Sequence, residues 1–510
     1  MARDSKNALV ALNRFGFGAR GGACDDFVNA AYDPRGFIKA DLARSRSALL
    51  EVPGLQSTPE LAKILYQHQH ENKLRDTAKL AQEAANGGAS SSMAPQDGMQ
   101  SMAPSDGMQR MAPRDAMQPS SPPPPAMPQD AMQPAAPPPP TPSPPMKIYR
   151  LEAKARLQRA VMAESGFVER LVGFWSNHFC ISIPKDGLVR IWAGSFEREA
   201  IRPHVLGRFA DMLKAVEQHP AMLFFLDNQQ SRGPTSRVGM GRKKGLNENL
   251  AREIMELHTL GVNGGYTQED VTSFASVLTG WTFGGRTDEA PGVFYFHANS
   301  HEPGAQRVLG KVYEAAGVTQ GEAVLADIAR HPSTAKFIAT KFARHFVADE
   351  PPPALVAKLE DVFIKTDGDL GLLASALIDA DEAWNVPLSK MRSPYEYLVA
   401  TFRLLSHVPE VPDQYIGALI TLGQPLWSPE GPNGFSDTNA VWAAPANMKL
   451  RLDLATYISR HMPESVDPRE LVDLFAGDAA SEDTRGTIAR AESRQQAMVL
   501  LMMSPEFQRR

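Results

Sequence analysis

Apolar residues recur at intervals of three and four along most of the chain, which is the period of helices that bury one face. The clearest stripe follows the spacing i, i+3, i+4 and i+7 and consists of Val271, Phe274, Ala275 and Leu278. Thr267 precedes this stripe with Asp270 three residues later, which makes a capping box with Asp in the usual Glu position. Gly280 follows the stripe as a helix stop. The pattern therefore predicts a helix that begins after Thr267 and ends before Gly280.

The stretch just before it predicts another helix, whose two faces differ in chemistry. Asn247 is a suitable N-cap, Glu248 falls in the first turn, and Gly261 follows the last periodic residue. The apolar face holds Leu250, Ile254 and Leu257, with His258 among them. The opposite face gathers polar side chains that fall close together at about 100° per residue, namely Asn249, Arg252, Glu253 and Glu256. This polar face is either a solvated surface, with Glu248 paired to Arg252, or the wall of a polar cleft.

Helical patterns continue on both sides of this stretch, notably from Pro59 to Ala85 and from Lys147 onward. Short alternation interrupts them in VFYFHANSHEPGAQRVLG, which begins at Val293 and predicts a hairpin or an ordered loop. Near the start, FGFGARGG spells G-x-G-x-x-G, but a helical pattern precedes it, so we interpret it as a glycine turn rather than a nucleotide site. The predicted fold class is mainly α, a large multi-helix domain with a short β-hairpin or extended loop insertion.

A disordered, low-complexity linker rich in Pro and Met is predicted to interrupt this domain. Residues 87–146 contain three copies of one short unit, MAPQDGMQS, MAPSDGMQR and MAPRDAMQP, followed by a proline-rich run. So much proline with so few large apolar groups cannot build a core. Residues 1–86 are then the N-terminal helical part of the main domain, and 147–510 are the rest of it. The repeats also place Met99 near Met102, and such thioether pairs would suit Cu(I), although a repeat that expanded in a tolerant linker is the alternative.

The composition limits the binding partners and the cellular compartment that we expect for the protein. The net charge of −5 over 510 residues gives no argument for binding nucleic acid. Cys24 and Cys180 are the only cysteines, too few for a disulfide framework or a cysteine zinc site. No apolar run reaches the length of a membrane span, and the first residues lack a secretory apolar region, which predicts a cytoplasmic protein.

The polar face of the second helix suggests acid–base chemistry. Glu253 and Glu256 would supply the acid and the base, assisted by His178 or His301. Helix neighbours three apart are too close for the usual carboxylate pair across a sugar bond, so one of them would need a partner from elsewhere. A metal-assisted version recruits His178, Glu253 and His301 as ligands of a divalent metal. The alternatives are that His178 is a hydrogen-bonded core histidine and that His301 caps a turn, and we expect His345 to be structural.

Substrate contacts are predicted from the same face and from two tryptophans. Asn249 and Arg252 lie beside the carboxylates. Trp281 and Trp427 would form the substrate wall, because indole rings suit stacking on sugars or other flat apolar faces. Trp427 belongs to LGQPLWSPEGPNGFSDTNAVW, a long rigid loop that either lines a binding site or is a packed Ω-loop.

A basic loop leads into the helix at Asn247. It reads SRGPTSRVGMGRKKG and carries Arg237, Arg242, Lys243 and Lys244. Beside a helix N-terminus such charges could receive an anion, and a plain solvated loop is the alternative. The Gly-Lys-Ser/Thr ending of a phosphate-binding P-loop is missing.

Several segments together resemble a bacterial family. They are NENLAREIMELHTLGVNGGYTQEDV with LTGWTF, the opening ALNRFGFGA, FWSNHF, HEPGAQRVLG, MRSPYEY, LGQPLWSPEGPNGF and the closing LLMMSPEFQRR. In these segments the chain is similar to the family named domain of unknown function 1800, over nearly its whole length except the linker. It departs at His301-Glu302, where a family member usually shows His-Asp. The resemblance implies a mostly helical fold and carries over no catalytic residue.

Two hypotheses for the function follow. The first is a hydrolase or lyase that acts on a polar polymer, such as a glycan, through a Glu/His cleft. The second rests on the resemblance, because genes of that family often lie beside those of a sulfatase-like, often exported family. It makes the chain a non-catalytic partner or carrier of a sulfatase-like protein, and co-export with that partner would place it in the periplasm.

Overall fold

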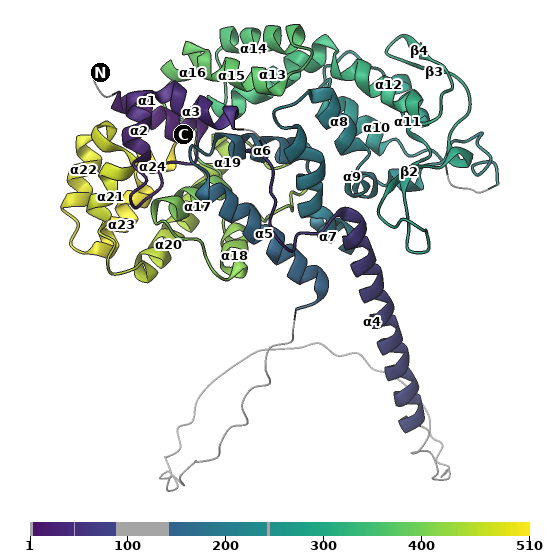
Figure 1. Ribbon diagram of the computed structural model, residues 1–510, viewed down its shortest axis with the longest axis horizontal. Coiled ribbons are helices and arrows are strands. Elements are labelled where there is room, and N and C mark those ends of the chain that lie inside the picture. Colours follow the sequence, from purple (N-terminus) through teal and green to yellow (C-terminus); the bar gives the residue numbers. More distant parts are fainter. Residues whose placement is uncertain (1–3, 45, 88–141, 242–244) are drawn as a thin grey trace, which may run out of the picture. The chain divides into compact units, whose positions relative to one another are not determined.

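The computed structural model describes residues 4–44, 46–87, 142–241 and 245–510, which form the coloured ribbon of Figure 1. Most of the predicted linker, with its paired methionines, lies outside the described residues. The same is true of residues 242–244 in the basic loop. The predictions of a copper site and of an anion site at these residues therefore stay predictions.

The chain forms two units, one made of Met1–His68 with Ser143–Arg510 and one made of Gln69–Pro142. Helix α4 (Thr58–Gly87) begins in the first unit and continues into the second. The strands and the other described helices belong to the first unit.

The predicted mainly helical fold is confirmed for the described residues. Besides α4, the first half of the chain forms α1 (Ser5–Val10), α2 (Asp26–Tyr32), α3 (Pro34–Ala43), α5 (Pro144–Met162), α6 (Phe167–His178), α7 (Gly187–Phe196), α8 (Phe209–Glu217), α9 (Pro220–Phe225) and α10 (Asn249–Glu253). The next helices are α11 (Gln268–Leu278), α12 (Val318–Ala329), α13 (Pro332–Phe346), α14 (Pro353–Lys365), α15 (Leu370–Asp379), α16 (Asp381–Asn385) and α17 (Pro394–Leu404). The last are α18 (Pro412–Thr421), α19 (Asn439–Trp442), α20 (Pro445–His461), α21 (Pro468–Phe475), α22 (Glu482–Ala489), α23 (Arg494–Met503) and α24 (Pro505–Gln508).

The predicted hairpin insertion is also confirmed, as two small antiparallel sheets. Strand β1 (Trp281–Phe283) pairs with β2 (Phe294–Phe296), and β3 (Gln306–Val308) pairs with β4 (Lys311–Tyr313). A hydrogen bond connects the β3–β4 sheet to α11. In it, the backbone N–H of Leu309 in the β3–β4 turn donates to Asp270 at 2.7 Å.

Helix α11 begins where its capping box predicts. The backbone N–H of Asp270 donates to the Thr267 hydroxyl at 3.2 Å, and the N–H of Thr267 donates to the Asp270 carboxylate at 2.8 Å. Gly280 then takes a φ of +84°, which favours glycine, and turns the chain from α11 into β1. Both ends of this helix could be predicted because their signals are local.

Helix α10 begins one residue later than the expected N-cap at Asn247 implies. The first helical residue is Asn249, and its backbone N–H donates to the Asn247 side chain at 2.9 Å. Glu248 therefore precedes the first turn. Its carboxylate accepts from Arg252 at 2.8 Å, the predicted i, i+4 pair, and also from the Thr272 hydroxyl at 2.7 Å. The second contact holds α10 against α11.

Three wide turns of π-helix occur within the described residues, and helical periodicity does not reveal them. They are η1 (Ala11–Phe15), η3 (Glu197–Ile201) and η6 (Ile254–His258). Each of them continues an α-helix with an i→i+5 turn, a feature that is frequent at functional sites. In η6 this turn carries Glu256 and His258.

The opening segment packs against helices from the far end of the sequence. In Figure 1, α1 and α2 lie beside α21, and one hydrophobic core extends from Ala8 to Phe507. The predicted glycine turn permits this approach, because a Cβ on Gly21 would lie 2.0 Å from the Leu404 carbonyl oxygen.

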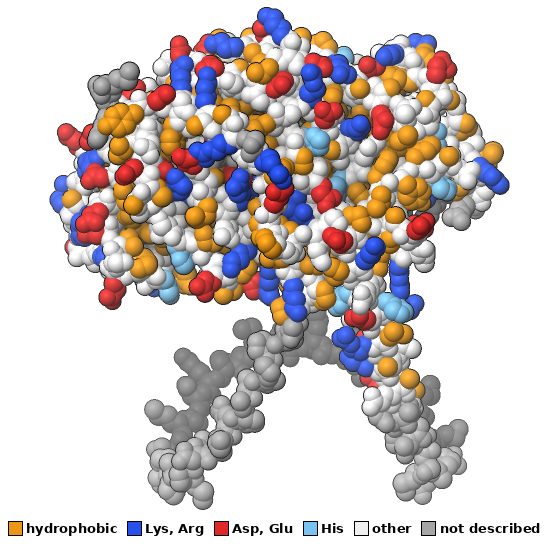
Figure 2. Space-filling view, viewed as in Figure 1, with side chains coloured by type: hydrophobic (Ala, Val, Ile, Leu, Met, Phe, Trp, Pro, Cys, Tyr) orange, Lys and Arg blue, Asp and Glu red, His pale blue; other side chains and the backbone are white. Residues whose placement is uncertain are grey.

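The surface carries both signs of charge. On the face shown in Figure 2, Lys and Arg side chains are interspersed with Asp and Glu. None of the helices in the described part is long and apolar enough to cross a membrane.

Candidate functional site

The predicted polar face on α10 and η6 is partly buried. Arg252, Glu253 and Glu256 keep intermediate exposure, and Asn249 is exposed. Burial raises the pKa of Glu253, and the nearby charge of Glu256 acts in the same direction. The two carboxylates therefore lie close to each other on one side of the helix, as predicted from the helical spacing.

His178 lies in the core at the end of α6. Its Nε2 is 3.0 Å from the carbonyl oxygen of His258, to which it donates, and its Nδ1 is buried without a partner. Burial holds the pKa of His178 well below its ordinary value, so the ring is neutral. His258 is fixed in turn by Glu217, whose Oε1 lies 2.8 Å from the His258 Nδ1. This environment favours the core-histidine interpretation of His178.

His301 lies apart from this group. Its Nδ1 donates to the carbonyl oxygen of Thr279 at 2.9 Å, and its Nε2 is buried without a partner. Within the described chain, no hydrogen bond, ion pair or ring contact joins His301 to Glu253 or His178. Nor do the described residues contain a group of three or more His, Cys, Asp and Glu side chains placed to hold a metal ion. The three predicted metal ligands are therefore not gathered into a preformed site.

The two predicted substrate tryptophans have different surroundings. Trp281 is completely buried and packs edge-on against Phe294, with ring centroids 5.6 Å apart, so it belongs to the core beneath the β1–β2 sheet. Trp427 is half-buried and lines a cavity. The predicted binding loop therefore does line a hollow in the protein.

This cavity has a volume of about 100 Å³ and lies between α5, α6, α17 and the loop 422–442. FWSNHF and MRSPYEY, two further segments noted for the resemblance, supply other parts of its wall. Ser436 is exposed at its rim, and Phe435 beside it is half-buried, so the cavity opens to solvent. The space has room for several water molecules, or for a small ligand that displaces them.

Arg156 of α5 is the most distinctive group in the wall. Its guanidinium lies 4.4 Å from the ring centroid of Tyr395 and 5.9 Å from that of Trp427. The Trp427 ring is held edge-on by Tyr149, with centroids 6.0 Å apart. Stacking on aromatic faces orients a guanidinium and leaves its N–H edge available.

A buried network of ion pairs anchors Arg156 from behind. Its Nε donates to Glu197 at 2.7 Å, and Glu197 also accepts from Arg202 at 3.0 Å. Arg202 makes a two-pronged pair with Glu169, at 2.8 and 2.9 Å. Burial by itself would lower the pKa of Arg156, but the Glu197 charge raises it, so the guanidinium stays protonated.

The terminal nitrogens of Arg156 have no charged partner. Its Nε donates to Glu197 and the Tyr415 hydroxyl lies near the guanidinium, but no carboxylate or carbonyl oxygen of the described residues accepts from its two terminal nitrogens. Gln424 is similar, because its Oε1 accepts from the Tyr395 backbone N–H at 2.8 Å while its Nε2 has no partner in the described chain. The Tyr395 hydroxyl also lacks a partner there, and burial raises its pKa to about 12, so it keeps its proton. The cavity therefore presents several unused donors.

One end of the cavity is formed by paired charges. Glu396 lies 3.2 Å from Arg170 and 2.7 Å from Arg510. Burial alone would raise the pKa of Glu396, but these two arginines lower it to about 2. Glu396 also closes the capping box of α17, because it accepts from the Ser393 N–H at 2.8 Å. A carboxylate so fully engaged is ionised and unsuited to donate a proton.

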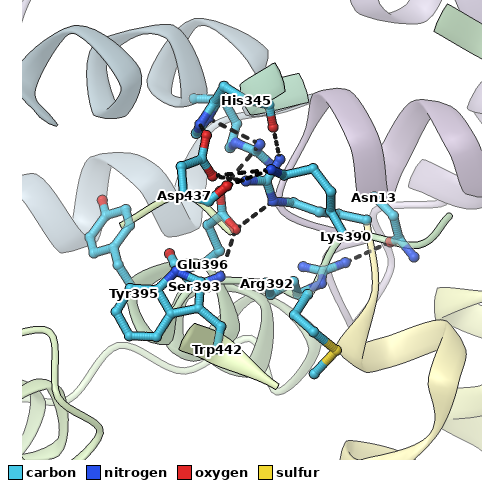
Figure 3. Close-up of polar contacts among 12 residues, drawn as sticks. Asn13, His345, Lys390, Arg392, Ser393, Tyr395, Glu396, Asp437 and Trp442 are labelled. Carbon is cyan, nitrogen blue, oxygen red and sulfur yellow. Dashed lines mark hydrogen bonds and ion pairs between the residues drawn. The ribbon is translucent and has the colours of Figure 1, made fainter. Parts of the chain in front are cut away.

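His345 and Asp437 complete that end of the cavity. In Figure 3 the carboxylates of Asp437 and Glu396 point toward a common centre, with His345 above them. The Nδ1 of His345 lies 2.9 Å from Asp437, and its Nε2 lies 3.3 Å from Arg170. Burial lowers the pKa of His345 to about 4, so the ring is neutral, donates to Asp437 and accepts from Arg170. His345, which we expected to be structural, is thus part of the cavity wall.

These observations define what the cavity can do chemically. The Glu396 carboxylate is already neutralised by arginines, and burial raises the pKa of the Cys180 thiol to about 12, so neither of these two described groups is an activated nucleophile. Its unused groups are donors, led by the Arg156 guanidinium. The arrangement is suited to hold an anion.

Comparison with known proteins agrees with the resemblance. The family model described as "Protein of unknown function (DUF1800)" matches residues 10–509. The chain belongs to the DUF1800 family. No curated protein and no solved structure matches it. Membership of DUF1800 therefore establishes the family and leaves the function to be argued from the cavity.

Three cavity residues of this DUF1800 chain, Arg156, Ser393 and Glu396, were missed at the sequence level, although each leaves a signal. Arg156 lies in the apolar stripe of α5, formed by Ala153, Leu157 and Ala160, where a charged residue is unusual. Ser393 and Glu396 spell a capping box that starts α17. No local signal connects any of the three to the loop 422–442.

Proposed function

We propose that this protein binds a small anionic ligand in the cavity through the guanidinium of Arg156. The observation that carries the proposal is the state of that side chain. Its Nε is fixed by Glu197 and its face by Tyr395, while neither terminal nitrogen donates to a carboxylate or carbonyl oxygen of the described chain. A preorganised guanidinium fork is the arrangement that proteins use to recognise a carboxylate or phosphate with two parallel hydrogen bonds.

Preorganisation supports binding, because little order has to be created when the ligand enters. Arg156 is buried on α5, and its partner Glu197 is held by Arg202. The Asn177 side chain exchanges two hydrogen bonds with the backbone of Phe435, at 3.0 and 2.8 Å. The loop that carries Trp427 is therefore pinned to α6.

Calorimetric titration of the full chain tests the proposal. The titrants are sodium acetate, inorganic phosphate, sodium D-glucuronate and D-glucose 6-phosphate, each at matched ionic strength. We expect saturable binding of at least one of these anions by the natural protein. Arg156→Lys should weaken that binding by about tenfold or more, because lysine keeps the charge but loses the fork.

Arg150→Lys is the matched control, since Arg150 lies on the same helix and pairs with Asp413 outside the cavity. It should bind like the natural protein. If no anion binds, or if Arg156→Lys and Arg150→Lys bind equally well, the proposal is wrong.

A second candidate function is favoured by one observation, the raised pKa of Glu253 beside Glu256. A carboxyl group whose pKa lies above its ordinary value suits a general acid, as a hydrolase or lyase acting on a glycan requires. Incubation with polygalacturonate, followed by an assay for new chain ends, tests this function. Glu253→Gln should abolish the release of chain ends, and Glu269→Gln, on the exposed side of α11, should not. Release that persists in Glu253→Gln contradicts this second function.

A further inference from the structure

We infer that the ligand of the cavity is a sugar acid of the hexuronate class, bound with its carboxylate on Arg156 and its ring against Trp427. This inference rests on the proposed function, because it names the class of anion that the same site takes. Three observations support it. The N–H groups at the start of α17 are already used, neutral donors remain free in the cavity, and Trp427 forms a flat wall.

The first observation separates a carboxylate from a phosphate. Phosphates are commonly held by the free N–H groups of a helix N-terminus. Helix α17 begins at the cavity, but its first donors are already used: the N–H groups of Ser393 and Glu396 in the capping box, and that of Tyr395 by Gln424.

The nearby positive charges are used as well. Arg170 and Arg510 are paired with Glu396 and Asp437. What remains is one planar fork with two parallel donors, and its charge is already shared with Glu197. This matches the two coplanar oxygens and the single charge of a carboxylate. A phosphate dianion would lack the further cations that it needs.

The second observation concerns the groups beside the fork. Gln424 and Tyr395 line the same cavity, and the Nε2 of Gln424 and the hydroxyl of Tyr395 have no partner among the described residues. Both are neutral hydrogen-bonding groups, which are suited to sugar hydroxyls and ring oxygens. A simple carboxylate such as acetate would leave them unused.

The third observation is the wall formed by Trp427. This residue has a φ of +50°, a conformation that a bulky side chain rarely adopts, and its indole N–H is buried without a partner. Trp427 lines the cavity wall and is only half-buried there. A flat apolar face beside a carboxylate fork matches a pyranose ring that carries an acid group.

The size of the cavity limits the ligand to one residue. A volume of about 100 Å³ has no room for an extended chain, and the exposed Ser436 marks its opening. The site is therefore suited to a free hexuronate or to the end of an acidic polymer.

Calorimetry of the full chain at neutral pH tests the inference with four probes: sodium D-glucuronate, D-glucose 6-phosphate, sodium acetate and D-glucose. We expect D-glucuronate to bind about tenfold or more tightly than acetate, since each good hydrogen bond to the ring adds to the affinity. D-glucose and D-glucose 6-phosphate should not bind measurably.

Gln424→Glu provides a variant that preserves the local structure. A glutamate keeps the oxygen that accepts from the Tyr395 N–H, but it replaces the free amide donor with a negative charge in the cavity that Arg156 also lines. It should abolish D-glucuronate binding, whereas Gln414→Glu, at an exposed position on the neighbouring helix α18, should not.

The outcomes distinguish a failure of the hexuronate inference from a failure of the proposed anion site. If D-glucose 6-phosphate binds as tightly as D-glucuronate, or acetate does, and Arg156→Lys abolishes that binding, the anion site stands and the hexuronate class is wrong. If D-glucuronate binds equally well to the natural protein and to Gln424→Glu, the placement of the ring is wrong. If no anion binds, the proposed function fails and the inference fails with it.

Discussion

The Nδ1 of His345 lies 2.9 Å from the Oδ2 of Asp437, although 92 positions separate the two residues in the sequence. Asp437 comes from the predicted binding loop and His345 from α13. On its other side the ring accepts from Arg170, which ties α6 into the same end of the cavity. One neutral imidazole thus joins three distant segments, and its protonation would break the join because a charged ring cannot accept from Arg170.

The His345 pair makes stability sensitive to acid. Burial lowers the pKa of His345 to about 4 in the folded state, below its ordinary value of 6.5. As the pH falls from 6.5 toward 4, the unfolded chain binds a proton at this ring and the folded chain does not. Stability is therefore lost over that window, by up to about 3 kcal/mol.

Urea unfolding at several pH values between 7 and 4.5 measures this effect. His345→Gln should unfold with a flatter dependence of the free energy on pH, while His461→Gln, at an exposed position, should behave like the natural protein. Equal slopes for His345→Gln and the natural protein would contradict the buried neutral ring.

The buried ion network behind Arg156 should dominate the response to loss of a single arginine. Arg202 is fully buried between Glu169 and Glu197, so Arg202→Met leaves two buried carboxylates short of positive charge. We expect a loss of about 3–5 kcal/mol in the free energy of unfolding. Arg208→Met removes an exposed pair with Asp367 and should cost about 0–1 kcal/mol. Chemical denaturation measures the free energy of unfolding of both variants. Similar losses in the two variants would mean that the ion pairs of Arg202 do not anchor Arg156.

Trp427 should contribute to affinity through its ring. Trp427→Ala removes the flat wall and should weaken D-glucuronate binding by roughly threefold to tenfold, whereas Trp427→Phe should weaken it less. Titration calorimetry provides the two affinities, and circular dichroism checks that both variants are folded. Unchanged affinity in Trp427→Ala would show that the ring lies elsewhere.

The capping box of α11 should act on stability alone. Thr267→Ala removes the side chain that accepts from the Asp270 N–H and should cost about 1 kcal/mol. Because α11 contributes nothing to the cavity wall, D-glucuronate affinity should stay as it is in the natural protein. A marked loss of affinity in this variant would indicate that the site depends on global stability rather than on its own residues.

The parts of the fold that could be predicted have local causes. The capping box at Thr267, the stop at Gly280 and the pair of Glu248 with Arg252 each depend on residues within a few positions of one another. The hairpin insertion could be predicted for the same reason. The π-turn in η6 could not, because a single turn of five residues is too short to show a period of its own.

The site could be predicted only in part, because its geometry is not local. The loop around Trp427 carried a signal, and it does line the cavity. Trp281 carried the same chemical signal but is buried by packing against Phe294. The contacts of Arg156 with Tyr395 and of His345 with Asp437 join segments far apart in the sequence, and no periodicity shows which segments meet.

A crystal structure of the full chain grown with sodium D-glucuronate would show the proposed binding mode. We expect density for a carboxylate within hydrogen-bonding distance of both terminal nitrogens of Arg156, with the sugar ring against Trp427. Ordered water alone in the cavity, with the sugar bound elsewhere or absent, would contradict it.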